Sequence, residues 1–159
     1  MWVRDNFRRN VFVSVVACVW MVGCHDYKWQ WSFQSPEDMQ RIEEQARQQQ
    51  KLVFIFYKWY LDSDANRMHG DVLADNEVGA LFSDTVNLLI DKAAGPNYER
   101  YLTKYGVTAP PACILIAPDG RYKVLTGYVP KERFIELVKA ARRELLDNQQ
   151  RPAPSKVVP

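Results

Sequence analysis

The sequence predicts an α/β fold in which a mixed sheet lies between two layers of helices. Two uninterrupted runs of apolar and aromatic residues, 52–57 and 86–90, have the length and composition of strands buried on both faces. Two more strands, 112–117 and 121–126, flank Pro118-Asp119-Gly120, a turn tight enough to make them an antiparallel hairpin. Helices and strands that alternate and then end in a hairpin and a helix predict a three-layer α/β/α sandwich.

Four helical stretches are predicted from apolar spacing and from residues that favour helix ends. Ser35-Pro36 opens the first, because a capping hydroxyl and a proline in the first turn both favour a helix start. Gly106 ends the third, because glycine tolerates the left-handed conformation at a helix end. The stretches cover residues 35–50, 63–82 with an interruption at 70–75, 96–105 and 129–147.

Length, composition and charge exclude several classes of protein for this chain. The chain has 159 residues, 47% hydrophobic and 25% charged, which fits one globular domain and not a mainly disordered protein. The charge-free stretch 11–24 is shorter than the roughly 20 apolar residues that span a bilayer. Formal charge is +2, and without residues 1–23 there remain 18 basic and 18 acidic groups. Because no basic excess remains, no nucleic-acid partner is expected.

The first 23 residues have the pattern of a secretory signal peptide. Residues 1–10 are basic and 11–23 are apolar, a length typical of a signal and too short for a stable transmembrane helix. Met21-Val22-Gly23-Cys24 resembles the lipobox of bacterial lipoproteins, which implies that Cys24 receives a diacylglyceryl group and becomes the mature N-terminus. We therefore expect an exported protein, lipid-anchored in a bacterial cell membrane or envelope. An uncleaved short anchor, or an ordinary signal in which Cys24 is incidental, are the alternatives.

Residues 24–34 link the signal to the domain, and two interpretations of them remain open. Aromatic side chains recur at every second position, with polar residues between them, as in a half-buried strand. The same rings would also suit a tether lying at the lipid interface. The rings belong to Tyr27, Trp29, Trp31 and Phe33. At the other end, residues 148–159 are polar and proline-rich and are expected to be disordered.

Residues 35–147 resemble the thioredoxin superfamily. Residues 51–59 look like the strand that leads into the family's redox loop, and 105–111 (YGVTAPP) look like its Y-G-V-x-x-x-P element. Residues 118–120 and 127–128 look like the hairpin turn and the glycine after the last strand. The resemblance implies a thioredoxin-like fold in which the peptide bond before Pro111 is cis.

The sequence departs from the family where redox members carry C-x-x-C. That motif opens a helix, whose N-terminus lowers the pKa of the first thiol. Counting back from Met68 puts the two cysteine positions at Asp62 and Ala65, whereas aligning on Trp59 puts them at Tyr60 and Ser63. Neither alignment contains sulfur. The resemblance therefore implies that this protein has the thioredoxin-like fold but lacks dithiol chemistry. The loop equivalent to C-x-x-C consists of Asp62, Ser63, Asp64 and Ala65.

A second departure precedes the predicted cis-proline. In the family, the residue at that position offers its backbone N–H and C=O to an extended client peptide. Here it is Pro110, which has no N–H. The usual client contact therefore lacks its donor.

Other reactive side chains give weaker signals, and no metal or cofactor is expected. Asp62, Asp64 and Asn66 have the spacing that begins a calcium-binding loop, but the required glycine and glutamate are missing, so helix capping is the better interpretation. His25 and His69 have no partner at ligand spacing. Cys113 begins an apolar run and is expected to be an inert thiol in a buried strand.

These observations predict a redox-inactive module that binds a protein partner. The binding surface is expected at Trp59, Tyr60 and Leu61 together with Pro110 and Pro111, because the fold places these two apolar loops side by side. Two alternatives remain. The first is an enzyme, either an oxidoreductase that uses Cys113 alone or a hydrolase that uses Asp62 or Asp64. The second is a purely structural envelope protein.

Overall fold

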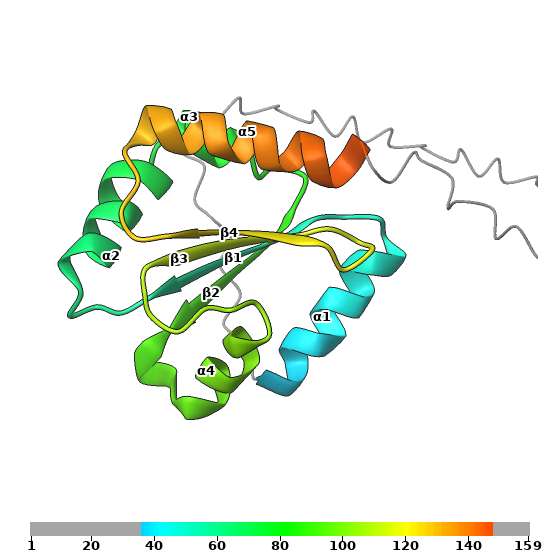
Figure 1. Cartoon of the computed structure of the whole chain (residues 1–159), viewed down its shortest axis with the longest axis horizontal. Helices are drawn as coiled ribbons and strands as arrows, with labels where there is room; N and C mark the ends of the chain where they lie inside the picture. The colour runs from blue at the N-terminus through cyan, green and yellow to red at the C-terminus, as the bar shows by residue number, and fades with distance from the viewer. Residues whose placement is uncertain (1–35, 148–159) are drawn as a thin grey trace, which may run out of the picture.

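The computed structural model describes residues 36–147, which form a four-stranded mixed sheet (Figure 1). The strand order is β2-β1-β3-β4. β1 pairs in parallel with β2, whereas β1 with β3 and β3 with β4 are antiparallel. The strands are β1 (Val53–Lys58), β2 (Val86–Asp91), β3 (Ala112–Ile116) and β4 (Tyr122–Thr126). The mixed sheet and the hairpin are as predicted.

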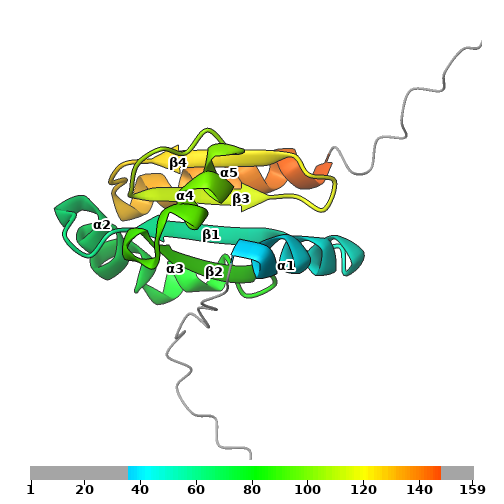
Figure 2. The same ribbon diagram turned by 90° about the horizontal axis from the view of Figure 1, so that it is seen from below.

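Helices cover both faces of this sheet, which confirms the three-layer α/β/α architecture (Figures 1 and 2). On one face lie α1 (Pro36–Gln48), the 3-10 turn η2 (Lys92–Ala94) and α4 (Pro96–Thr103). On the other lie α2 (Ser63–Arg67), η1 (Met68–Leu73), α3 (Asn76–Ala80) and α5 (Lys131–Asp147).

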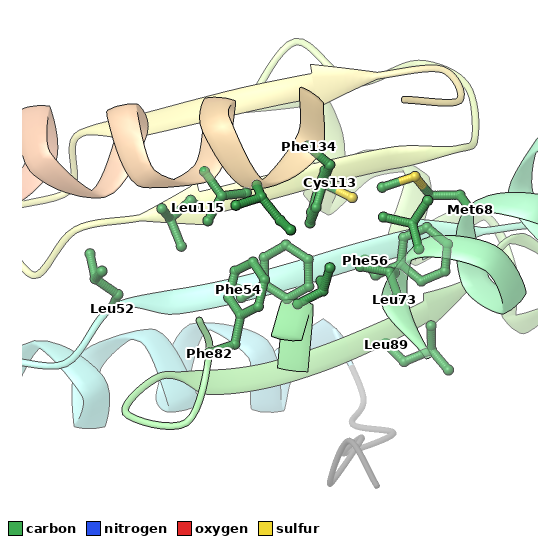
Figure 3. Packing of buried hydrophobic residues seen from close by; sticks show 14 of the residues in the cluster. Leu52, Phe54, Phe56, Met68, Leu73, Phe82, Leu89, Cys113, Leu115 and Phe134 are labelled. Atoms are coloured by element: carbon green, nitrogen blue, oxygen red, sulfur yellow. The ribbon is translucent and has the colours of Figure 1, made fainter. Parts of the chain in front are cut away.

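Alternating side chains of β1 divide between two hydrophobic clusters, one on each face of the sheet. Phe54 and Phe56 belong to the cluster under α5, where the Phe54 and Phe82 ring centroids are 4.1 Å apart (Figure 3). Val53, Ile55 and Tyr57 belong to the cluster under α1 and α4. Because side chains alternate across a strand, an uninterrupted apolar run fits a strand that is buried on both faces.

The predicted interruption at residues 70–75 is confirmed only at Ala74 and Asp75, and it does not begin at Gly70. A π-helical segment, η1, continues directly from α2 to Leu73, and the chain turns only at Ala74 and Asp75. Glycine lowers helix stability by only about 1 kcal/mol. Burial of Met68, Val72 and Leu73 against the core offsets this cost.

Several sequence-based predictions concern residues outside the described range. The signal peptide 1–23, lipidation of Cys24, the two interpretations of 24–34 and the tail 148–159 all belong to this group. Within 36–147, no helix is long and apolar enough to cross a membrane.

Candidate functional site

The loop between β1 and α2 is held in shape by hydrogen bonds around Asp62. Its side-chain Oδ1 accepts a hydrogen bond from the Ala65 amide at 2.7 Å, which makes Asp62 the N-cap of α2. Its own amide donates to the Trp59 carbonyl at 3.0 Å. Asn66 Nδ2 donates to the Tyr60 carbonyl at 2.8 Å and so fixes the outer part of the loop. The predicted helix cap is therefore confirmed for Asp62, and Ser63 is the first helical residue.

Two large apolar side chains of this loop are exposed next to each other. Tyr60 is 57% and Leu61 63% exposed. Trp59 is half-buried, and the Lys92 ammonium lies 5.1 Å from its ring centroid, a cation–π distance. The loop thus presents an apolar surface whose inner side is packed on the domain.

The Pro110–Pro111 peptide bond is cis and lies at the same end of the sheet. Tyr57 pairs with Ala112 in the antiparallel β1–β3 ladder, so the residues that follow β1 and those that precede β3 leave the sheet together. Pro110 is half-buried and Pro111 is buried. Pro111 therefore offers almost no side-chain surface, and its prediction as a partner contact is corrected. Its carbonyl accepts from the Gly127 amide at 2.8 Å.

Cys113 is the second residue of β3, and its side chain points into the core and not toward this loop. It is buried in the cluster that contains Phe54 and Phe134 (Figure 3). Burial raises the pKa of the Cys113 thiol well above its usual range, so the reactive thiolate is disfavoured. This geometry agrees with the predicted inert thiol and disfavours the single-cysteine oxidoreductase.

Sequence reasoning missed several neighbours of the loop. Lys92 comes directly after β2, and Trp59 comes directly after β1. Because parallel strands bring their carboxyl ends to the same edge of a sheet, the contact between these two residues could have been predicted from the expected topology. The Arg67 guanidinium lies 3.9 Å from the Tyr128 ring centroid, a contact that the sequence does not indicate. His69 stacks on Phe56, and burial, with a smaller effect of Lys58, lowers the pKa of its imidazole.

Comparison with known proteins identifies the family. The model of the thioredoxin-like domain matches residues 13–142, which is most of the chain. The chain therefore belongs to the thioredoxin-like domain family. No curated protein sequence matches it.

Solved structures share the fold of this thioredoxin-like domain at low sequence identity. The reduced C-terminal domain of Neisseria meningitidis DsbD is 23% identical, with a TM-score of 0.59 over 67% of this chain and 96% of that one. The oxidised form gives 22% and 0.61, over 69% and 98%. A thioredoxin from Thermus thermophilus gives 17% and 0.59, over 74% and 91%. These likenesses support the fold alone.

The loop from β1 into α2 of this thioredoxin-like domain contains no cysteine. The sequence has no cysteine between Cys24 and Cys113, so the whole loop from β1 into α2 lacks a thiol. At the helix start, a carboxylate accepts the amide hydrogen bond. The site is therefore the loop that joins the end of β1 to the N-terminus of α2, and its exposed apolar surface comes from Tyr60 and Leu61.

Proposed function

We propose that this protein is an exported, lipid-anchored thioredoxin-like domain without dithiol redox activity, which binds a protein partner in the bacterial cell envelope. The contact surface is the strand-end surface, defined as Trp59, Tyr60, Leu61 and Pro110. The observation that carries the proposal is the pair of adjacent exposed side chains, Tyr60 and Leu61, on a loop that has no thiol.

The hydrogen bonds of the loop support a binding role. Exposed apolar side chains carry an aggregation hazard, so a loop that exposes two of them together needs a compensating use. The Trp59 carbonyl accepts from the Asp62 amide and the Tyr60 carbonyl from the Asn66 side chain of α2, which holds the loop backbone before a partner arrives. A preformed surface loses less conformational entropy on binding.

The missing thiol and the missing donor support a role without disulfide exchange. A carboxylate cannot exchange with a disulfide, and the Asp62 side chain accepts a hydrogen bond from the Ala65 amide in the first turn of α2. Pro110 has no N–H to offer to an extended peptide. Cys113 is too deeply buried to replace either group.

The test compares variants of the full-length protein in folding and in partner capture from native membranes. Tyr60→Ala and Leu61→Ala should change the free energy of unfolding by about 0.5 kcal/mol or less, as exposed positions do. The same changes should make the free energy of binding to the partner about 2 kcal/mol less favourable, as at an interface hot spot, and so reduce the amount of partner captured. Tyr122→Ala removes an exposed tyrosine from β4 and is the matched control. Unchanged capture by both variants would reject the strand-end surface.

A separate measurement tests the anchor. Intact-mass analysis of the membrane fraction should give a mature chain that begins at a lipidated Cys24, and Cys24→Ser should release the protein from membranes. A soluble mature protein with another N-terminus would reject anchoring without affecting the binding test.

A further inference from the structure

The outer edge of β4 has no strand beside it within residues 36–147. β4 is an end strand of the sheet and pairs with β3 alone (Figure 2). Its first residue, Tyr122, is 43% exposed and is the one large, exposed apolar side chain of the described residues that lies outside the strand-end surface. An exposed edge strand that carries apolar side chains is a template for another strand.

Hydrogen bonds at the two ends of the hairpin show which backbone groups of β4 point outward. The Ala117 amide donates to the Arg121 carbonyl, and the Gly127 amide donates to the Pro111 carbonyl, both at 2.8 Å. Arg121 and Gly127 therefore face β3, and so does every second residue between them, because backbone groups alternate in direction along an antiparallel strand. The residues whose N–H and C=O groups face away from the sheet are Tyr122, Val124 and Thr126.

The side chains of β4 are divided between the two faces of the sheet. Val124 packs against the cluster under α1 and α4, and the Tyr122 ring centroid lies 5.0 Å from that of Tyr105 in the same cluster. Lys123 points to the opposite face, where its Nζ lies 2.7 Å from Glu144 Oε1 of α5. Lys123 is the one charged residue of β4, and this ion pair balances its charge.

The sequence of β4 is complementary to itself in one antiparallel register. With Val124 opposite Val124 of a second copy, every outward N–H and C=O group of both strands has a partner. Tyr122 then faces Thr126, a favourable aromatic and β-branched pair, and Lys123 faces Leu125. A shift in one direction places Lys123 opposite Lys123, and like charges directly opposite are destabilising. A shift in the other direction carries the groups of Tyr122 beyond the end of the second strand.

We propose that the outer edge of β4 binds a second copy of this chain, and that the two copies form a symmetric dimer through antiparallel pairing centred on Val124. The sheet then continues from one copy into the other. The same patch serves both copies, as in other two-fold interfaces. The pairing also gives the exposed Tyr122 ring a neighbour, Thr126 of the second copy.

The symmetry of this dimer is compatible with an anchor on each copy. The two-fold axis of an antiparallel strand pair is perpendicular to the sheet, so α1 and α4 of both copies lie on the same side of the joined sheet. Because α1 begins at Pro36, the chain enters both domains through that layer. With the lipid on Cys24, which is part of the proposed function, one bilayer can hold both anchors. A five-residue strand pair is short, and confinement to a membrane raises the effective concentration of the second copy.

Disulfide formation between single-cysteine variants of the full-length protein tests the pairing. In Val124→Cys the two Cα atoms would be about 5.5 Å apart, within the range that a disulfide spans. In Tyr122→Cys they would be roughly 13 Å apart along the strands, which is too far. The disulfide should form roughly tenfold faster at position 124 than at position 122, because only the paired thiols are held together before oxidation. Cys113 is buried, and peptide mapping assigns each disulfide.

A mixture of two variants tests the register. Tyr122→Cys and Thr126→Cys should form a mixed disulfide when combined, whereas neither should form one alone. Adding Val124→Pro to both chains should abolish the mixed disulfide, because it removes an outward amide and leaves the hydrogen bonds to β3 in place. Val124→Ala keeps the amide and is the matched control. Thermal melting shows whether each variant is folded.

Exposure alone predicts the opposite order of reactivity. Tyr122 and Thr126 are exposed, whereas Val124 is half-buried, so disulfides that form by random collision should favour positions 122 and 126. That order would overturn the pairing. The absence of a disulfide at position 124 in folded protein would overturn it as well, whether the edge is free or is covered by another part of the chain or by another protein.

The same comparison in membranes and in concentrated detergent solution separates this inference from the proposed function. Position 124 should be preferred over position 122 in both, and the membrane should change only the rate. Loss of anchoring would remove that rate difference and leave the preference for position 124 unchanged. The strand-end surface belongs to the loops after β1 and before β3, away from the edge of β4, so failed capture of a partner would also leave this preference unchanged.

Discussion

The Asp62 carboxylate accepts a hydrogen bond from the Ala65 amide at 2.7 Å, across the first turn of α2. Asp62 is the N-cap, and Ala65 is fully buried. Tyr60, by contrast, precedes the N-cap by two residues and is exposed. Of the two alignments of the missing cysteine pair, the one on Asp62 and Ala65 fits a motif that opens a helix. The amide that would stabilise a thiolate there is bound to a carboxylate.

We expect the double substitution Asp62→Cys with Ala65→Cys to form an intramolecular disulfide and to gain disulfide reductase activity. The new thiolate at position 62 would accept the amide hydrogen bond at the helix N-terminus, which lowers the pKa of a cysteine. An insulin-reduction assay measures the gain. Tyr60→Cys with Ser63→Cys is the matched control and should remain inactive. Activity in the control pair alone would mean that the alignment on Trp59 is the correct one.

Cys113 should be almost unreactive in the folded protein. Burial raises the pKa of its thiol, so thiolate is scarce at neutral pH and reagents cannot reach it. Peptide mapping after alkylation should find Cys113 unmodified in native protein and fully modified in denaturant. Cys113→Ser should lower the free energy of unfolding by about 1–3 kcal/mol, because a hydroxyl is buried among apolar groups. Cys113→Ala should cost less. Rapid alkylation of Cys113 in the native protein would contradict this prediction and would favour an oxidoreductase that uses Cys113 alone.

Buried tyrosines should make the protein lose stability at alkaline pH. Burial, aided by Glu99 and Asp91, raises the pKa of Tyr57 to about 12. Burial and the Glu43 carboxylate, which accepts from both hydroxyls, also raise the pKa of Tyr101 and of Tyr105.

The pH window follows from the direction of these shifts. A raised pKa means that folding favours the neutral phenol, so the Tyr57 contribution is complete below pH about 10 and is lost as pH rises toward 12. Chemical denaturation across this range, with absorbance at 295 nm to follow ionisation, measures both effects. Tyr57→Phe should become more stable relative to the unmodified protein as pH rises above 10. A constant difference between the two proteins would contradict the assignment.

Asp75 should stabilise the start of α3. Its Oδ1 accepts from the Glu77 and Val78 amides, and its Oδ2 is 3.2 Å from Lys131 Nζ. Asp75→Ala should cost about 1 kcal/mol of unfolding free energy, whereas Asp75→Asn, which keeps a capping oxygen, should cost less.

Acid should weaken the contribution of Asp75. The hydrogen bond from Lys131, with smaller help from the α3 amides, holds the pKa of the Asp75 carboxyl below its usual value. A lowered pKa means that this contribution is complete above pH about 4 and is lost as pH falls through the folded-state pKa. Urea denaturation at neutral pH and near pH 3 measures the change. A cost of Asp75→Ala that grows as pH falls would contradict it.

The sequence by itself determined the fold, because local patterns encode it. The apolar runs at 52–57 and 86–90 favour strands that are buried on both faces, and Pro118-Asp119-Gly120 favours a tight turn. The absence of sulfur from the loop before α2 is also a fact of the sequence. The role of Asp62 as a helix cap is also local, because aspartate is preferred at the N-cap, where its side chain accepts from an amide two or three residues later.

Tertiary structure decided everything that depends on contacts between distant residues. Whether Gly70 interrupts a helix depends on how deeply Val72 and Leu73 pack against the core, which no local pattern contains. Pro110 and Pro111 look alike in sequence, yet only the packing of β3 beside β1 buries Pro111 and leaves Pro110 half-exposed. Burial depends on what the remainder of the chain places against a residue, and that becomes known only after the sheet and both helical layers have assembled.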